Sequence, residues 1–344
     1  MKSIFPYVPG DFQPRHLKCA ACQQDFPLPL TKRYQHPLAH VRPNDFRPVT
    51  NNVYWQIHSL EIPCPKCRHK TPFVLPSVPM KVVLPLYGDE ASREQTGQCV
   101  QVLAFVGSDP RLEASVRQTW HEMKTRIAPD RAPESWRLHM MELWKTSGGR
   151  RHPVFHAMTP EQRMAAKEAV ADAYFSLRND VFSFVGIYRA PKLTRSVKQQ
   201  ALLSVLAYML ERLCPRGTAP KITLESDQLA DGKAGMSYGT THALKEFQRS
   251  LLYAILCRGL PVEEIAAARS TDVFWFELAD YVAYVVARAC LRRWQGIAPD
   301  LDPARLGTTF WIGTQPGGNI YCDRCQDIPW EKFGGWPAAA TNPT

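Results

Sequence analysis

Three pairs of cysteines have the spacing of metal ligands. The pairs are Cys19/Cys22, Cys64/Cys67 and Cys322/Cys325. A CxxC turn presents two thiolates to one ion, and two such turns complete the closed tetrahedral site of a structural zinc. We expect the two N-terminal pairs to form this site. The 41 residues between Cys22 and Cys64 exceed the roughly 15–20 residues usual between such pairs, so the spacing predicts an insertion in the Pro-rich stretch over residues 28–52.

The third pair, Cys322/Cys325, has four interpretations. It is a redox dithiol, a zinc half-site shared with another chain, a simple turn, or a replacement for one of the N-terminal pairs. The Gly-rich residues 317–319 supply no helix N-terminus that would lower a thiol pKa, which favours a structural role. The other cysteines lie singly in apolar segments, where we expect small buried hydrophobes. They are Cys99, Cys214, Cys257 and Cys290.

Acidic residues occur at the ends of two expected strands. Asp89 and Glu90 follow an apolar strand-like segment. Glu225 and Asp227 share one face of the strand expected over residues 221–227, because strand side chains alternate between faces. If the two strands are neighbours in one sheet, these acids approach one another.

A fifth acid, Asp280, lies on an apolar stripe of an expected helix, together with Val273, Phe276, Tyr284 and Ala287. A carboxylate on a core-facing stripe needs a partner or a metal ion. Acids that converge from two strand ends and a helix hold Mg²⁺ or Mn²⁺ for phosphoryl chemistry. The sequence therefore predicts a divalent-metal site.

The alternative interpretation of the same acids is structural. Asp89 then begins a turn, Asp272 caps the last helix, and Asp280 pairs with an arginine such as Arg195. Each acid taken singly favours this interpretation, whereas their combined order along the chain favours the metal site.

The hydrophobic periodicity predicts an α/β fold with a mixed sheet flanked by helices. Strands are expected over residues 81–87, 98–108, 181–187 and 221–227, and helices over 111–126, 134–145, 160–178, 196–214, 240–258 and 273–294. Three regions are expected: a zinc-ribbon-like module over 1–78, the α/β domain over 79–311, and an irregular tail over 312–344 that carries the last CxxC pair.

The composition limits the class of protein. With 45% hydrophobic and 22% charged residues, the 344-residue chain is expected to fold into about two domains and not to be disordered. No apolar run reaches the roughly 18 residues of a membrane span, and the N-terminus does not resemble a signal peptide. We therefore expect a cytoplasmic protein with reduced thiols and no membrane partner. The net charge of +10 favours polyanionic partners such as nucleic acid.

Four segments resemble, in order, the prokaryotic domain-of-unknown-function 3800 family. Leu86–Ser92 resembles its strand-ending Asp-Glu-Ser motif, and Leu103–Ser108 its second strand. Leu138–Leu143 is similar to its His-containing segment, and Phe276–Asp280 to its late Leu-Ala-Asp helix. The resemblance covers about residues 80 to 296 and leaves out the cysteine-rich N-terminus.

The resemblance implies an RNase H-like fold and a metal-dependent nuclease. It places metal ligands at Asp89, at Glu225 or Asp227, and at Asp280, with Glu90 as a helper. In an RNase H-like sheet the first strand must lie beside the strand over 221–227, because only that adjacency brings the strand acids together. Phosphates would be held by cationic side chains. The candidates are Arg93, Lys192, Arg195 and Lys198.

The chain departs from the family pattern at two positions. Ala91 interrupts the Asp-Glu-Ser run, and Pro85, which cannot donate a hydrogen bond, predicts a bulge or an edge position in its strand. Both departures are compatible with a catalytically inactive, zinc-containing nucleic-acid-binding or adaptor protein, which is the alternative to a nuclease. A thiol oxidoreductase that uses the third cysteine pair is a further alternative.

Overall fold

A computed structural model describes part of the chain. The described residues are 16–27, 59–74, 77–95, 98–145, 152–190, 192–225, 244, 247–248, 251–263, 265–268, 274–300, 303–306, 308–314 and 320–321. Among them, no helix combines the length and the apolar character that crossing a membrane requires.

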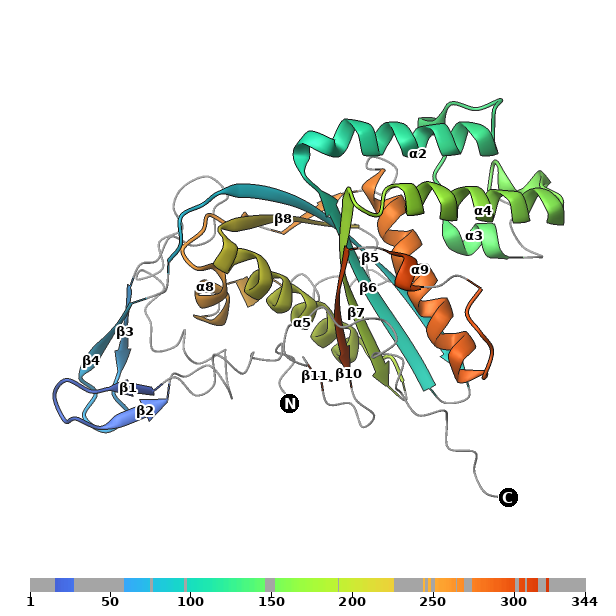
Figure 1. The fold of residues 1–344 in the computed structure, drawn as a ribbon. Helices are drawn as coiled ribbons and strands as arrows, with labels where there is room; N and C mark the ends of the chain where they lie inside the picture. Colours follow the sequence, from blue (N-terminus) through green and yellow to red (C-terminus); the bar gives the residue numbers. More distant parts are fainter. Residues whose placement is uncertain are drawn as a thin grey trace, which may run out of the picture.

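The described residues contain a seven-stranded mixed sheet (Figure 1). Its strands, in spatial order, are β11 (Ile320–Tyr321), β10 (Thr308–Thr314), β7 (Val181–Ala190), β6 (Gln98–Ser108), β5 (Val82–Gln95), β8 (Thr218–Glu225) and β9 (Ala266–Ala268). The first three along the chain, β5, β6 and β7, form an antiparallel meander. The next strand, β8, pairs in parallel with β5 on its other side. This pairing confirms the expected adjacency of the two acid-bearing strands.

Helices cover both faces of the sheet (Figure 1). One face carries α9 (Trp275–Trp294), with α2 (Glu113–Ile127), α3 (Met140–Trp144) and α4 (Pro160–Ser176) packed around it; the other carries α5 (Arg195–Leu213) and α8 (Leu251–Cys257). Because both faces are covered, β6 is a nearly continuous apolar run.

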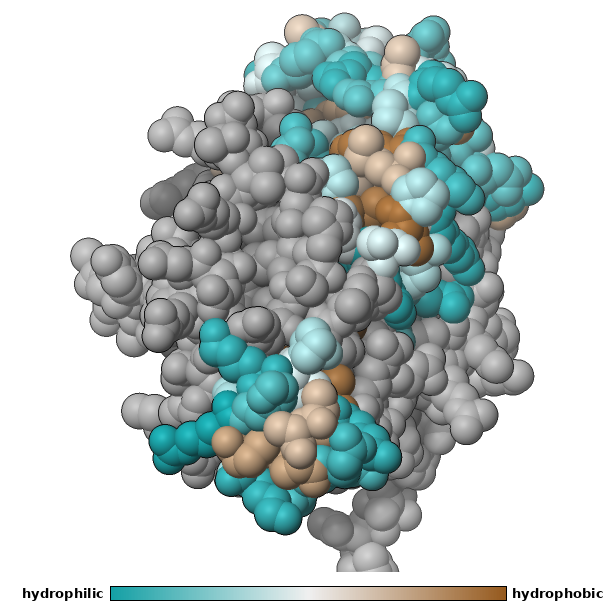
Figure 2. Space-filling view, turned by 90° about the vertical axis from the view of Figure 1, so that its left-hand side faces the viewer, coloured by the Kyte–Doolittle hydropathy of each residue, from teal (hydrophilic) through white to brown (hydrophobic). Residues whose placement is uncertain are grey.

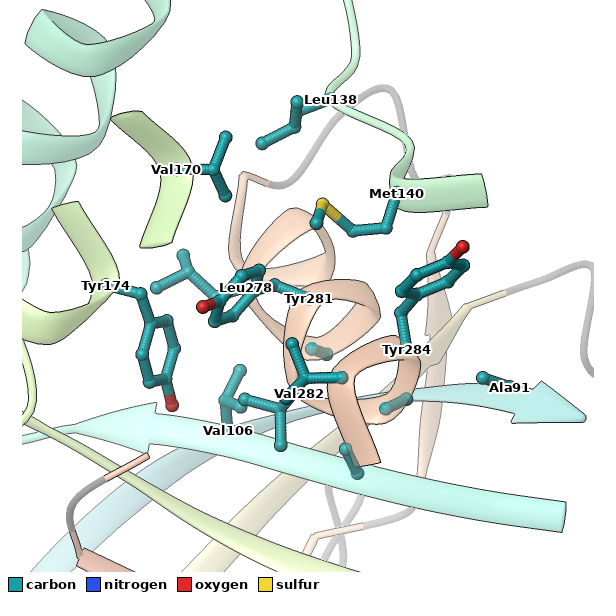
Figure 3. Close-up of a cluster of buried hydrophobic side chains, with 14 of the residues drawn as sticks. Ala91, Val106, Leu138, Met140, Val170, Tyr174, Leu278, Tyr281, Val282 and Tyr284 are labelled. Carbon is teal, nitrogen blue, oxygen red and sulfur yellow. The ribbon is translucent and has the colours of Figure 1, made fainter. Parts of the chain in front are cut away.

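Helix α9 lies between β5 and β6 on one side and α3 and α4 on the other. Figure 3 shows its residues Leu278 and Val282 in the buried cluster that joins Val106 of β6 to Tyr174 of α4. The helix is therefore buried nearly all round over its first three turns. A polar side chain at this depth, such as that of Asp280, must have a polar partner.

Pro85 lies in β5 at a point where the strand pairs on one side only. The pairing with β8 runs from Val82 to Gly88, whereas the pairing with β6 begins at Tyr87. Pro85 is thus at a local edge, which resolves the bulge-or-edge alternative. A Cβ on Gly107 would lie 2.3 Å from the Pro85 carbonyl oxygen, so glycine permits the close approach of β6 there.

Two short hairpins form the N-terminal cysteine module. Their strands are β1 (His16–Lys18) with β2 (Asp25–Pro27), and β3 (Ser59–Pro63) with β4 (Lys70–Val74). Phe26 and Ile62 of this module are buried in the same apolar cluster as α5 and α8.

Two expected elements were wrong. The helix expected over 134–145 is a 3-10 turn, Pro133–Ser135, followed by non-helical residues 136–139 and the short α3. The backbone amides of Leu138 and Met140 donate to side chains of α9 and not to carbonyl groups of a preceding helical turn. The tail expected to be irregular from residue 312 supplies the end of β10 and all of β11, because β10 finds a parallel partner in β7.

Candidate functional site

Three predicted acids meet beneath residues 136–140. Asp89 comes from β5, Glu225 ends β8, and Asp280 lies on α9; each retains only 5–6% of its accessible surface. In the parallel pairing of β5 with β8, Gly88 lies opposite Leu224, so the residues that follow them, Asp89 and Glu225, are neighbours at the point where β8 ends and β5 continues. Burial of three carboxylates in one place demands compensating charge.

Arg137 supplies part of that charge. Its Nη1 donates to Glu225 Oε1 at 2.7 Å and its Nη2 to Glu225 Oε2 at 3.2 Å. The Nη2 group also lies 3.5 Å from Asp89 Oδ2. Arg137 therefore stands between the two strand acids. When they are ionised, Asp89, Glu225 and Asp280 repel one another.

The pKa values of Asp89 and Asp280 reflect burial and this repulsion. Burial, followed by repulsion from Asp280 and Glu225, raises the pKa of Asp89 well above its ordinary value. Burial also raises the pKa of Asp280, although His139, the Met140 amide and Arg137 oppose the shift. At Asp89, the repulsion from each of the other two carboxylates outweighs the attraction of Arg137.

The segment that carries Arg137 is attached to α9 by two carboxylates. The Leu138 amide donates to Glu277 Oε1 at 2.9 Å, and the Met140 amide donates to Asp280 Oδ2 at 2.7 Å. The alternate residues Arg137 and His139 direct their side chains to the carboxylates, Arg137 to Glu225 and His139 toward Asp280. This attachment explains why the segment is not helical.

Glu277 belongs to a separate buried network that fixes this attachment. Its Oε1 accepts from Lys124 Nζ at 2.7 Å and its Oε2 from Trp120 Nε1 at 2.7 Å. Lys124 also donates to the Trp136 carbonyl at 2.6 Å. Lys124 and Glu277 are 3% and 4% exposed, so this is a buried ion pair whose partners are further hydrogen-bonded.

His139 lies at the edge of the carboxylate cluster. Its Nδ1 is 3.6 Å from Asp280 Oδ2, and its side chain is 35% exposed. An imidazole that is near a buried carboxylate and reachable by solvent can exchange protons with a bound molecule. His152 supports the neighbouring backbone, because its Nε2 lies 2.8 Å from the Arg137 carbonyl oxygen.

Glu90, the expected helper, lies on the other face of the sheet. It follows Asp89 in the strand, so its side chain points the opposite way. There it accepts hydrogen bonds from Gln101 Nε2 and, at 3.1 Å, from Lys198 Nζ. The structure therefore does not bring Glu90 to the carboxylate cluster.

The remaining predicted residues have varied positions. Asp227 and Asp272 lie outside the described residues, as does the side chain of Arg195. Arg93 lies 4.5 Å over the ring of Tyr284, and Lys192 is exposed.

Arg137 and His139 were not predicted as site residues. A signal was present, because Trp136 and Leu138 are apolar while Arg137 and His139 are polar. This alternation has the period of an extended chain. The structure buries the first two and leaves the other two partly exposed.

The four N-terminal cysteines lie close enough to hold a metal ion such as zinc. Their sulfur atoms are all within 4.8 Å of one another. Cys19 and Cys67 are 3.5 Å apart, and Cys22 and Cys64 are 3.6 Å apart. Four sulfurs at about 2.3 Å from a tetrahedral zinc are separated by about 3.8 Å, so the donor set fits this ion.

Backbone amides lower the pKa of the first thiol of each pair, Cys19 and Cys64. Hydrogen bonds from the Cys22 and Ala21 amides lower the pKa of Cys19 to about 6, although burial opposes the shift. The Cys67 and Lys66 amides lower the pKa of Cys64 in the same way. Thiolates are the form that binds metal.

The other cysteines fall into two groups. The four single cysteines are buried, as expected for small apolar residues. The pair Cys322/Cys325 lies outside the described residues.

Comparisons of the chain with protein-family models, with curated proteins and with solved structures gave no match. The residues and their geometry therefore carry the functional interpretation.

Proposed function

We propose that the chain is a metal-dependent nuclease that hydrolyses phosphodiester bonds of DNA or RNA. One observation carries the proposal: Asp89, Glu225 and Asp280 converge, buried, from two parallel neighbouring strands and a helix. Carboxylate oxygens are the ligands of hard divalent cations, and the mutual repulsion of these carboxylates favours such a cation. The net charge of +10 suits a nucleic-acid substrate.

The fold proposed for this domain is RNase H-like. The position of β5 beside β8 supports it, because this fold requires the first strand to adjoin the strand that carries the second acid. The meander of β5, β6 and β7 and the placement of the third acid on a late helix agree with the same arrangement.

Each residue of the cluster has a proposed role. Asp89, Glu225 and Asp280 would hold Mg²⁺ or Mn²⁺, which supplies Lewis-acid chemistry and an activated water when bound. His139 would pass a proton to the leaving oxygen from the solvent side. Arg137 holds the strand acids in place, and it must release at least one of them when a cation enters.

For the cysteine cluster we propose a structural zinc. Four thiolates close the coordination sphere and leave no position for a substrate. The ion would join the two hairpins, which otherwise share few buried apolar residues.

Arg137 also favours a second candidate, a catalytically inactive nucleic-acid-binding or adaptor protein. Among the described residues, the ligand atoms of a possible metal site lie within 4.8 Å of one another, and the three carboxylates do not meet this condition. The guanidinium between Asp89 and Glu225 satisfies both without a metal ion. In this candidate the cluster is purely structural.

Cleavage assays separate the two candidates. The chain is incubated with labelled single-stranded and duplex DNA and RNA, with Mg²⁺ or Mn²⁺ and without either. We expect divalent-dependent cleavage that Asp89→Asn abolishes and Asp109→Asn leaves unchanged, since Asp109 is bound to the exposed Arg111. Binding without cleavage under every condition would support the adaptor.

A further inference from the structure

The two cysteine turns have the same backbone conformation. In the first, the Cys19 amide donates to the Gln24 carbonyl and the Gln23 amide to the Cys19 carbonyl, both at 2.9 Å. In the second, the Cys64 and Arg68 amides make the equivalent bonds at 2.9 Å. Gln23 and Arg68 also share the left-handed conformation, with φ of 59° and 61°. The turns therefore correspond residue by residue, from Cys19 to Asp25 and from Cys64 to Lys70.

The two turns differ sharply in charge. Ala21, Gln23, Gln24 and Asp25 of the first correspond to Lys66, Arg68, His69 and Lys70 of the second. All eight residues are exposed. Since the first turn adopts the same conformation with uncharged residues and one acid, the cysteine site does not require the cations of the second. The conformation of this second turn, residues 65–70 and here called the basic turn, therefore does not require the positive charges of Lys66 and Arg68.

We propose that the basic turn binds the phosphate backbone of nucleic acid. This inference rests on the proposed function, and it places the contact with nucleic acid on the basic turn. Exposed Lys and Arg side chains neutralise phosphates and release condensed counterions without reading the base sequence. The turn lies at the tip of the second hairpin, away from α9 (Figure 1), so it would hold the strand outside the carboxylate cluster.

The surface around the turn favours nucleic acid over an anionic membrane. Peripheral membrane binding needs large apolar side chains that enter the lipid. Among the side chains that the structure describes in this module, those of residues 17–26 and 62–72, no large hydrophobic one is exposed. Figure 2 views the molecule from this side, and the module in its lower part is largely hydrophilic around a small apolar patch.

The test transfers charge between the corresponding turns. The variant Lys66→Ala/Arg68→Gln gives the second turn the residues of the first at these two positions, and we call it the neutral variant because both substituted residues become uncharged. Adding Ala21→Lys/Gln23→Arg then restores the net charge of +10 but places it on the other turn. Every substitution introduces a residue type that the same backbone already accommodates. Zinc content and circular dichroism check that each variant folds, and Arg68→Gln alone serves if the double variant does not.

Binding of the full chain to a short labelled DNA duplex, and to an RNA duplex of the same sequence, is measured without added divalent cation. Between about 50 and 200 mM salt, we expect the neutral variant to lower the slope of log affinity against log salt by about 1.8. The ratio of the native affinity to that of the neutral variant is then roughly tenfold larger at the lower salt concentration than at the higher one. We expect the charge-transfer variant to stay as weak.

Three results would overturn the proposal. They are native binding by the neutral variant, full recovery in the charge-transfer variant, and binding of the native chain to phosphatidylserine vesicles but to neither duplex. The nuclease proposal fails separately: a chain that binds through the basic turn but never cleaves keeps this inference and loses that one.

Discussion

Arg137 and Glu225 form a two-pronged ion pair across 88 residues of sequence, with hydrogen bonds of 2.7 and 3.2 Å. The guanidinium fork matches the two oxygens of the carboxylate. This pair joins the segment over α9 to the end of β8. It also places the cation of the cluster where a divalent ion would compete with it.

The first prediction concerns the loss of this cation. We expect Arg137→Met to destabilise the metal-free protein by about 3–5 kcal/mol, because removing one partner leaves buried charge uncompensated. We also expect added Mn²⁺ to stabilise this variant more than the native chain, since Arg137 no longer competes. Urea unfolding with and without Mn²⁺ measures both effects.

Arg111→Met is the control for that variant. Its ion pair with Asp109 has an arginine side chain that is 87% exposed, and such exposed pairs contribute little to stability. Equal losses in the two variants, or no effect of Mn²⁺ on Arg137→Met, would argue against a cation-binding cluster.

The second prediction separates chemistry from stability at Asp280. We expect Asp280→Asn to abolish Mn²⁺-dependent cleavage while changing the melting temperature little. An asparagine oxygen can still accept from the Met140 amide, and it removes a carboxylate that burial disfavours. The measurements are a cleavage assay and a thermal melt. A large drop in stability without any activity in the native chain would defeat the nuclease proposal.

The third prediction concerns Glu277, one helical turn before Asp280. We expect Glu277→Gln to cost about 3–5 kcal/mol, because it leaves the buried Lys124 ammonium without its counter-charge. Denaturant unfolding measures the cost. The difference in the free energy of unfolding between Glu277→Gln and Asp280→Asn is the informative quantity, since both variants replace a buried acid of α9 with its amide. Similar costs would mean that both acids are structural.

The fourth prediction concerns pH. The pKa of Asp89 is raised in the folded protein above its ordinary value of 3.8, chiefly by burial. The folded state therefore binds this proton more tightly than the unfolded state, and its contribution to stability is lost as pH rises through the folded pKa. We expect the metal-free native chain to lose stability, relative to Asp89→Asn, as pH rises from the ordinary pKa of 3.8 through the raised pKa of the folded state.

Mn²⁺ should remove that difference, because a bound cation favours the ionised carboxylate. Unfolding midpoints of both chains across the pH series, with and without Mn²⁺, give the comparison. Parallel curves for the two chains in the absence of metal would contradict the raised pKa.

The fifth prediction concerns the cysteine cluster. We expect the purified chain to retain about one equivalent of zinc, and Cys64→Ser to lose it and to destabilise the two hairpins. Cys99→Ser is the matched control, because Cys99 is equally buried but lies in β6. Metal analysis after gel filtration is the measurement. Full retention in Cys64→Ser would remove the zinc proposal, and loss in Cys322→Ser instead would move it to the third pair.

Local patterns in the sequence were sufficient for several of these features. Each CxxC turn is a short-range structure, so Cys19 and Cys64 could be recognised as paired ligands without a fold. The strand over 98–108 and the stripe that holds Asp280 follow from hydrophobic periodicity, which is also local. The structure confirms that strand and the burial of Asp280 among Phe276 and Tyr284.

Only the tertiary structure decided which charges face one another. The sequence left Glu225 and Asp227 as alternatives, and the structure places Glu225 beside Arg137. The family resemblance placed Glu90 at the same site as Asp89, although the alternation of strand side chains directs Glu90 to the other face of the sheet. The sequence predicted a helix through Arg137. In the structure this segment is not helical, and its backbone amides donate to the carboxylates of α9. The position of Glu90 follows from the local alternation of the strand, whereas the pairing of Arg137 with Glu225 and of the amides with the carboxylates of α9 does not. The physical reason is that a buried charge is stabilised by partners distant in sequence, and no local pattern encodes them.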